Sequence, residues 1–355
     1  MNNISNFYKN KKILITGVTG FKGAWLAKWL LLLGANVHGL GFNKKKRENL
    51  FYELNLEKKI YLKFIDIRDI EKLTNYINRI KPSIVFHLAS QTLIHDSYKF
   101  PQQTFDINCT GSLNILEITR KSKFIKSLII TTSDKCYESK KGSKGFKEID
   151  RLGGIDPYSA SKVSVEIMLR AYQKSFFEKK KIGASSVRSG NVIGGGDWSA
   201  KRLVPDCIRS LRENKTIFLR NPNFNRPWQF VLEPLRGYLV LAKEQFKNSK
   251  KYSSAWNFGT KPNTVTNVKT IVNHLVNFWG TGNIKIGKNI FYEQMNLQLN
   301  IDKAKKFLKW EPTYSIKHSI KLTVEWYKRV AIKKEDPIKV TEDQIKEYMN
   351  DSKIN

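Results

Sequence analysis

Short β-branched runs alternate with helix-like segments through the first half of the chain, and this alternation limits the possible folds most. The run from Lys12 to Thr16 stops at Gly17, as a buried parallel strand does before a turn. Further strands are expected at residues 35–40, 61–65, 83–88, 127–132 and 182–187. Helical spacing lies between most of them, for example at 24–33, 70–80 and 105–121. This order predicts an α/β fold with a doubly wound parallel sheet of the Rossmann type.

The composition and pattern of the chain change after Arg188, where glycines and prolines cluster and helical runs become shorter. We therefore expect two lobes. A Rossmann-type dinucleotide-binding domain would comprise residues 1–187 with about 232–262. A smaller C-terminal substrate lobe would comprise residues 188–231 with about 263–355. The segment 188–198 is predicted to be a turn-rich loop that can close over a ligand.

The net charge of +32, from 63 basic and 31 acidic residues, is the one unusual bulk property. It could indicate a nucleic-acid partner. The lysines, however, are spread over the whole length, which favours solvated surface charge and no nucleic-acid partner. A positive field would still attract a small polyanionic substrate.

Three cysteines, far apart in the sequence, predict neither a disulfide framework nor a metal site. The longest apolar stretch, residues 26–35, contains Lys28 and is too short for a bilayer, and the polar first ten residues do not resemble a signal peptide. We therefore expect a cytoplasmic protein with no membrane contact.

Gly17, Gly20 and Gly23 form a GxxGxxG pattern directly after the first predicted strand, and Phe21 lies among them. Glycines are needed where backbone approaches a pyrophosphate at a helix N-terminus. A glycine-rich tight turn is the alternative, but the strand before the pattern and the helix after it favour a dinucleotide site.

The second strand ends without the carboxylate that commonly binds the ribose of NAD. The basic residues 44–47 that follow could favour NADP, or could be a solvated loop. After the third strand, Asp66 next to Ile67 could accept a hydrogen bond from the adenine amino group. Equally, an Asp there could cap the helix that begins near Asp69.

The fourth strand ends in His87, Leu88, Ala89, Ser90 and Gln91, at the carboxyl edge where ligands bind in such sheets. Small residues there leave room for a nicotinamide riboside. We interpret His87 as a packed strand residue and expect Asn108 to hold a backbone bend or a water near the site.

Tyr158 and Lys162 lie four residues apart in a helix that Asp156-Pro157 should begin. The ammonium is expected to lower the phenol's pKa and make it a usable base. Ser133, Asp134 and Lys135 follow the fifth strand and add a second acid/base pair, unless Asp134 and Lys135 form only a surface ion pair. Both sets together suit elimination of water through a transient ketone.

In the second lobe, Arg202 and Arg226 are candidates for bidentate contacts to a diphosphate. Asn191 lies in the turn-rich segment and is a further candidate for substrate binding. Trp198 and Trp228 could stack on a base or sugar, although core packing is the default for any single Trp.

These residues together resemble the nucleotide-sugar 4,6-dehydratases of the extended short-chain dehydrogenase/reductase superfamily, and among them the CDP-glucose 4,6-dehydratases. The matching segments are 19–23, 25–26, 132–138, 156–159, 187–198, 226–229, 256–259 and 341–348. Asp134-Lys135 is the more specific mark, because dTDP- and GDP-sugar dehydratases typically have Asp-Glu there.

The resemblance implies that Tyr158 takes the proton from the 4-hydroxyl of CDP-glucose while hydride passes from C4 to NAD. Ser133 would bind the same oxygen. Lys135 would remove the C5 proton, and Asp134 would protonate the departing 6-hydroxyl. Return of hydride to C6 would give a 4-keto-6-deoxy sugar, of the kind used for deoxysugars of lipopolysaccharide O-antigen. The resemblance also implies a homodimer, or a dimer of dimers, formed through helices at 105–121 and 159–176.

Two alternatives stay open. An epimerase of the same superfamily needs the Tyr158/Lys162 pair but not Asp134 and Lys135. A non-catalytic nucleic-acid-binding relative would fit the charge, but would be expected to have lost Tyr158 or Lys162.

Overall fold

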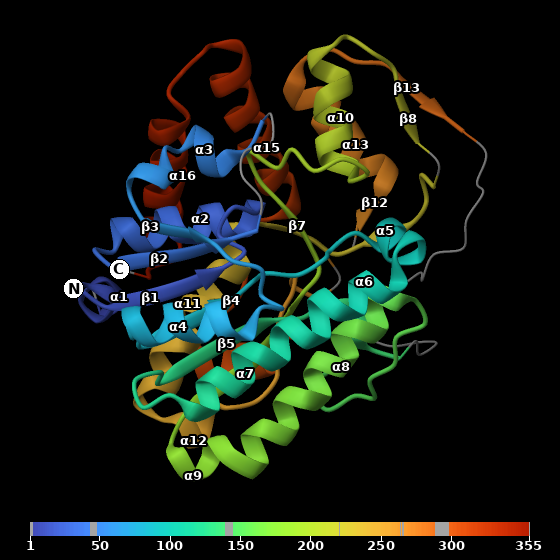
Figure 1. Ribbon diagram of the computed structural model, residues 1–355. Helices are drawn as coiled ribbons and strands as arrows, with labels where there is room; N and C mark the ends of the chain where they lie inside the picture. Colours follow the sequence, from blue (N-terminus) through green and yellow to red (C-terminus); the bar gives the residue numbers. More distant parts are fainter. Residues whose placement is uncertain are drawn as a thin grey trace.

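A computed structural model describes residues 3–42, 48–138, 145–219, 221–262, 264, 266–287 and 298–354 (Figure 1). Its centre is a seven-stranded sheet in the order β11-β6-β5-β4-β1-β2-β3. The strands are β1 (Lys12–Thr16), β2 (Asn36–Gly41), β3 (Tyr61–Phe64), β4 (Ile84–His87), β5 (Ser127–Thr131), β6 (Gly183–Ser189) and β11 (Trp256–Phe258). All neighbouring pairs are parallel. The predicted doubly wound parallel sheet is confirmed, and each predicted strand lies within two residues of its expected bounds.

Helices cover both faces of the sheet, because side chains alternate along each strand. In β1, Ile13 and Ile15 pack into one core with α2 (Phe21–Leu32) and α11 (Leu232–Lys247). Leu14 packs into the opposite core. That core also holds α4 (Ile70–Ile80), α7 (Gly111–Lys121) and α8 (Pro157–Tyr172).

The other helices are α1 (Asn3–Tyr8), α3 (Leu50–Glu53), η1 (Leu56–Lys58), α5 (Ile94–Lys99), α6 (Pro101–Phe105), η2 (Asp106–Thr110), η3 (Asp134–Cys136), η4 (Gln173–Phe177), α9 (Glu178–Lys180), α10 (Leu203–Arg212), α12 (Ser249–Tyr252), α13 (Val268–Trp279), α14 (Asp302–Leu308), α15 (Ile316–Tyr327), η5 (Lys328–Ile332) and α16 (Pro337–Asp351). Three small sheets accompany them. They pair β7 (Asn191–Ile193) with β10 (Trp228–Phe230), β8 (Ile217–Leu219) with β13 (Ile284–Ile286) and β9 (Asn225–Arg226) with β12 (Thr266–Asn267).

The end of β6 corrects one expectation. Arg188 was assigned to a turn-rich loop, but β6 continues to Ser189 and Arg188 is buried within it. A charged side chain is tolerated there because Glu166 of α8 pairs with it at 2.8 Å.

The last helix packs on the first lobe's side of the molecule. Lys28 of α2 forms a 2.6 Å ion pair with Glu342 of α16, and the rings of Trp29 and Tyr348 meet edge to face with centroids 5.8 Å apart. The helices α10 and α13 instead lie away from the sheet with β8 and β13 (Figure 1). The division into two lobes at the expected boundaries stays a prediction.

Glu233 of α11 attaches the C-terminal part of the chain to the sheet layer. Its buried carboxylate accepts hydrogen bonds from the backbone N–H groups of Thr313 and Tyr314, at 3.0 and 2.8 Å, and from the Tyr348 hydroxyl at 2.6 Å. One side chain therefore holds both the segment before α15 and the helix α16.

Replacing Glu233 with Ala should lower the free energy of unfolding by about 3–5 kcal/mol, because several buried donors lose their acceptor. Urea denaturation measures this change. Glu325→Ala, at an exposed position of α15, is the control and should shift stability by less than about 0.5 kcal/mol. Equal shifts for both variants would contradict this role of Glu233.

Candidate active site

The turn after β1 brings the glycine triplet against the end of β4. Gly17 has a φ of +71°, and a Cβ there would lie 2.7 Å from the backbone nitrogen of Ala89. A Cβ at Gly23 would lie 2.3 Å from the Gly17 carbonyl oxygen, so only glycine lets α2 pack this close. Within the described residues no side chain caps α2, which begins at Phe21 after Gly20. Its first amides can therefore bind an anion.

The end of β4 is held beside this turn by Thr16. The Leu88 amide donates to the Thr16 carbonyl at 3.1 Å, and the Ala89 amide donates to the Thr16 hydroxyl oxygen at 3.2 Å. His87 lies 2.7 Å from the same hydroxyl, and burial lowers the pKa of His87 to about 3. His87 is thus a neutral packed residue, as expected.

Asn108 holds the chain beyond β4, which confirms one of its two expected roles. Its side chain accepts from the Gln91 amide at 2.8 Å and donates to the Gln91 carbonyl at 3.1 Å. It also donates to the Ser161 hydroxyl of α8 at 2.8 Å. Asn108 lies in the wide helical turn η2 and joins the Gln91 bend to the helix that carries Tyr158.

The residues after β3 show that Asp66 is not the cap of the following helix. The helix α4 is capped by Asp69, whose side chain accepts from the Lys72 amide at 3.0 Å. Asp66 instead accepts from the Arg68 amide at 2.9 Å and pairs with its guanidinium at 2.6 Å. The pKa of Asp66 is lowered, first by its hydrogen bond to the Arg68 side chain. Asp66 and Ile67 lie at the sheet edge expected for an adenine ring.

Residues 44–47, which could favour NADP, lie outside the described residues. The strand β2 ends at Gly41, and the exposed Phe42 that follows offers no carboxylate.

The turn after β5 buries Ser133 and Asp134 and leaves Lys135 half-buried. The Ser133 hydroxyl accepts from the Lys135 amide at 3.2 Å and donates to an Asp134 carboxylate oxygen at 3.0 Å. Asp134 is 5% exposed, so it is not part of a surface ion pair. Burial raises the pKa of its carboxyl group, opposed by Lys135 and Ser133. Cys136 is fully buried and burial also raises the pKa of its thiol, so it is no nucleophile here.

The helix α8 begins as the sequence predicts. Asp156 is the N-cap and accepts from the Ser159 amide at 2.9 Å, and Pro157 is the first helical residue. Tyr158 and Lys162 are both buried, and the ammonium nitrogen lies 5.9 Å from the Tyr158 ring centroid.

The expected lowering of the Tyr158 pKa by Lys162 is not found, because the pKa of Tyr158 is raised. Burial raises the pKa of Tyr158 to about 12, opposed by its hydrogen bond with Ser133 and by Arg202. Burial also lowers the pKa of Lys162 to about 7, with a further lowering by Lys22. Sequence spacing places the two groups on one helix face, but burial is the largest cause of both pKa shifts.

The candidate diphosphate arginines approach the two acid/base sets. Arg202 precedes α10, donates to Asp197 at 3.3 Å and lowers the pKa of Tyr158 electrostatically. Arg226 in β9 is buried and opposes the rise in the pKa of Asp134. The structure thus brings one guanidinium toward each set.

Asn191 and Trp228 are paired partners in the small sheet of β7 and β10. Trp228 is 9% exposed, and its indole N–H has no hydrogen-bond partner among the described residues. Asn191 is half-buried, and its backbone N–H donates to the Pro227 carbonyl at 3.1 Å. A Cβ at Gly190 would lie 2.9 Å from Pro227 and 3.4 Å from Asp134, so this sheet adjoins the catalytic turn.

Two residues near the site were missed from the sequence. Lys22 in the glycine turn lies close enough to lower the pKa of Lys162. Glu166 follows Lys162 by four residues, and this spacing on the same helix face was a signal that could have found it. Among the described residues, no group of three His, Cys, Asp or Glu side chains could hold a metal ion. The described part of the chain also has no helix of the length and apolar character needed to cross a membrane.

Replacing Lys162 with Met should change how stability depends on pH. In the unfolded chain a lysine has a pKa near 10.4, but burial lowers that of Lys162 to about 7. Between these values the unfolded state binds the extra proton, so this group makes stability rise with pH. We expect wild type to gain about 2 kcal/mol over the variant from pH 7 to pH 9.

Urea unfolding at each pH measures this difference. Lys126→Met, at an exposed position, is the control and should differ from wild type equally at both pH values. A gap between wild type and Lys162→Met that does not change with pH would mean that buried Lys162 keeps its charge.

Comparison with known proteins finds several nucleotide-sugar 4,6-dehydratases that are similar to this chain. The family model described as GDP-mannose 4,6 dehydratase matches residues 14–323. The chain is 39% identical to the CDP-glucose 4,6-dehydratase of Salmonella typhimurium, over 97% of this chain and 98% of that protein. It is 24% identical to GDP-mannose 4,6 dehydratase 1 of Arabidopsis thaliana, over 92% of each.

Solved structures show the same fold. The dTDP-glucose 4,6-dehydratase of Bacillus anthracis in complex with NAD has a TM-score of 0.76 at 21% identity, covering 90% of this chain and 97% of that one. The UDP-glucose 4-epimerase of Thermotoga maritima has a TM-score of 0.79 at 23% identity, covering 90% and 99%. Because an epimerase fits as well as a dehydratase, the fold alone does not select the reaction. From the matching family model and the 39% identity over nearly the whole length, the chain belongs to the GDP-mannose 4,6-dehydratase family.

Proposed function

We propose that this protein is an NAD-dependent lyase that converts CDP-glucose to CDP-4-keto-6-deoxyglucose. The observation that carries the proposal is the turn of buried Ser133 and Asp134 with half-buried Lys135 beside Tyr158 and Lys162, two acid/base sets in one place. The near full-length similarity to the Salmonella typhimurium CDP-glucose 4,6-dehydratase supports this substrate.

The turn between β1 and α2 fits a dinucleotide. Gly17, Gly20 and Gly23 keep it free of side chains, and the N-terminus of α2 presents amides to a pyrophosphate. Leu88, Ala89 and the bend at Gln91 that Asn108 holds would flank the nicotinamide half, and Asp66 with Ile67 the adenine. NAD, when bound, supplies a hydride acceptor for the sugar C4 and a hydride donor for C6.

Tyr158 and Ser133 would handle the 4-hydroxyl. Their side chains are hydrogen-bonded to each other, so one sugar oxygen can contact both. Burial raises the pKa of Tyr158 to about 12, and Tyr158 would accept the hydroxyl proton only as this pKa falls during the reaction. Lys162 donates to the Thr131 carbonyl at 3.2 Å, which keeps its nitrogen fixed beside the phenol.

Asp134 and Lys135 would carry the elimination. A ketone at C4 acidifies the C5 proton, which Lys135 would remove and would return to C5 when hydride reaches C6. The raised pKa of Asp134, caused by burial, supports its role as the acid that protonates the departing 6-hydroxyl. Arg202 and Arg226 would bind the diphosphate, with Asn191 and Trp228 near the nucleoside or sugar.

An epimerase remains the second candidate, because its fold matches equally well. It has no use for the buried Asp134 and the half-buried Lys135, and this favours the dehydratase. The expected cytoplasmic location stays a prediction.

The direct test incubates the protein with NAD and CDP-, dTDP-, GDP- or UDP-hexoses and measures mass. Loss of water from CDP-glucose alone is expected. Without any water loss the dehydratase is excluded, and epimerase and RNA-binding assays then separate the two alternatives.

Lys135→Met should abolish deuterium exchange at C5 while NAD binding persists, since only the base is removed. Mass spectrometry of products formed in deuterium oxide measures the exchange. Lys126→Met is the matched control, because Lys126 is exposed directly before β5, whereas Lys135 lies in the turn after it. Retained exchange in Lys135→Met would contradict the role given to Lys135.

We also infer that the protein is a homodimer through α7 and α8. These two helices run side by side on one flank of the molecule (Figure 1). They and their extensions expose apolar side chains, namely Phe105, Leu113, Ile167 and Phe176. Ile167, 61% exposed, is a large apolar residue that a partner helix would cover.

Ile167→Glu should therefore convert a dimer to a monomer, because a buried unpaired carboxylate opposes association. Sedimentation velocity at micromolar concentration measures the mass. Phe218→Glu, at an equally exposed position on β8, is the control and should leave the dimer intact. A monomeric wild type, or a dimeric Ile167→Glu, would exclude this interface.

A further inference from the structure

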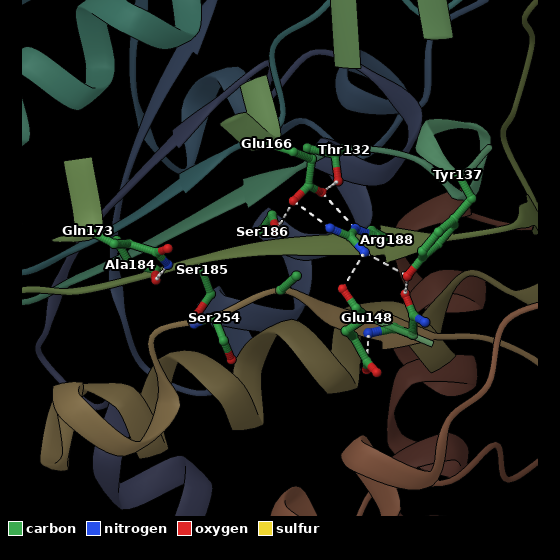
Figure 2. A network of polar contacts seen from close by, with 12 residues as sticks. Thr132, Tyr137, Glu148, Glu166, Gln173, Ala184, Ser185, Ser186, Arg188 and Ser254 are labelled. Carbon is green, nitrogen blue, oxygen red and sulfur yellow. Dashed lines mark hydrogen bonds and ion pairs between the residues drawn. The ribbon is translucent and has the colours of Figure 1, made fainter. Parts of the chain in front are cut away.

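A buried ion pair between Glu166 and Arg188 lies at the centre of a network of hydrogen bonds (Figure 2). Glu166 and Arg188 form a two-pronged contact, with Nε and Nη2 of the guanidinium each donating at 2.8 Å to a separate carboxylate oxygen. Their side chains are only 5% and 3% exposed. Such a pair fixes direction as well as distance, because both groups are planar.

The pair attaches both ends of the catalytic turn. Thr132, directly before the turn, donates its hydroxyl to Glu166 at 2.5 Å. Tyr137, directly after it, accepts from Nη1 of Arg188 at 2.6 Å (Figure 2). The residues between these two anchors, 133–136, include the Ser, Asp and Lys given roles above.

The same pair also orients α8. Tyr158, Lys162 and Glu166 follow at intervals of four residues, so they share one face of the helix. Because Glu166 is tied to β6 through Arg188, this face is turned toward the sheet.

Almost all hydrogen-bonding groups of the Glu166 and Arg188 side chains have a partner. The Glu166 carboxylate accepts four hydrogen bonds, including one from the Ser186 hydroxyl at 2.7 Å. Arg188 also donates to the Glu148 carbonyl at 3.3 Å. Burial would raise the pKa of Glu166, but Arg188 outweighs it and holds that pKa below its usual range. A fully satisfied buried network is rigid and tolerates little displacement.

We infer that Glu166 and Arg188 are positioning residues, which hold the Tyr158/Lys162 pair and the Asp134/Lys135 pair in register through Thr132 and Tyr137. Oxidation at C4 and elimination across C5 and C6 can then act on one sugar in one bound position. This inference rests on the proposed dehydratase function.

Thr132→Val, which removes one hydroxyl at constant shape, tests the link. The reaction is quenched with acid, and mass spectrometry measures the ratio of oxidised sugar, lighter by two hydrogens, to dehydrated sugar. Misplaced elimination groups should raise this ratio and lower kcat by about tenfold, with KM within about twofold of wild type. Thr132→Ser keeps the hydroxyl and should restore both values. Tyr137→Phe should act like Thr132→Val.

Two matched controls lie outside the network. Thr119→Val alters a buried threonine of α7, and Tyr8→Phe removes a buried hydroxyl that donates to the Leu239 carbonyl at 2.7 Å. They change stability without changing the product ratio if the network is specific. Thermal melting of every variant shows whether a changed product ratio comes from partial unfolding or from misplaced catalytic groups in a folded protein. Glu166→Gln is informative only if it folds. The Thr132 and Tyr137 variants therefore decide whether the pair has the positioning role.

The two proposals fail differently. If wild type dehydrates CDP-glucose and Thr132→Val gives the same product ratio as the controls, the positioning role is wrong and the function stands. If wild type removes no water from any nucleotide sugar, the function is wrong and the inference with it.

Discussion

Parallel pairing of the central strands is the constraint on which the site depends. Hydrogen bonds between β1, β4, β5 and β6 align their carboxyl ends at one edge of the sheet. Gly17, Leu88 and Ser133 follow three of these strands and so meet at that edge although they are far apart in sequence. A slip of one residue would turn each strand's side chains to the other face and separate the groups.

Burial then sets the protonation of the groups that the sheet collects. Desolvation raises the pKa of Tyr158 and Asp134 and lowers that of Lys162, so burial shifts each group toward its neutral form. The substrate that we propose, a nucleotide sugar, carries negative charge on its diphosphate. The arginines near both acid/base sets suit such a substrate.

The Glu166–Arg188 pair illustrates why a buried charge can persist. Removing two charges from water is unfavourable, and an apolar pair would fill the same space without that penalty. A guanidinium and a carboxylate, however, can bind a turn, a helix and a strand at defined angles. Orientation, rather than stability, is the physical advantage that we assign to them.

Local spacing determined much of this protein from the sequence alone. Strand runs, the glycine triplet, the Asp156-Pro157 helix start and the i, i+4 placement of Tyr158 and Lys162 depend on neighbours within a few residues. The family resemblance followed from the same segments.

Tertiary structure decided what those residues experience. Arg188 lies in a strand and not a loop because Glu166, 22 positions away, neutralises it. Asp66 is held by Arg68 while Asp69 caps the helix, and the pKa of Tyr158 rises where spacing suggested a fall. Spacing places a group on a helix face or strand end, but its solvation and its ion-pair partner depend on which distant segments pack against it.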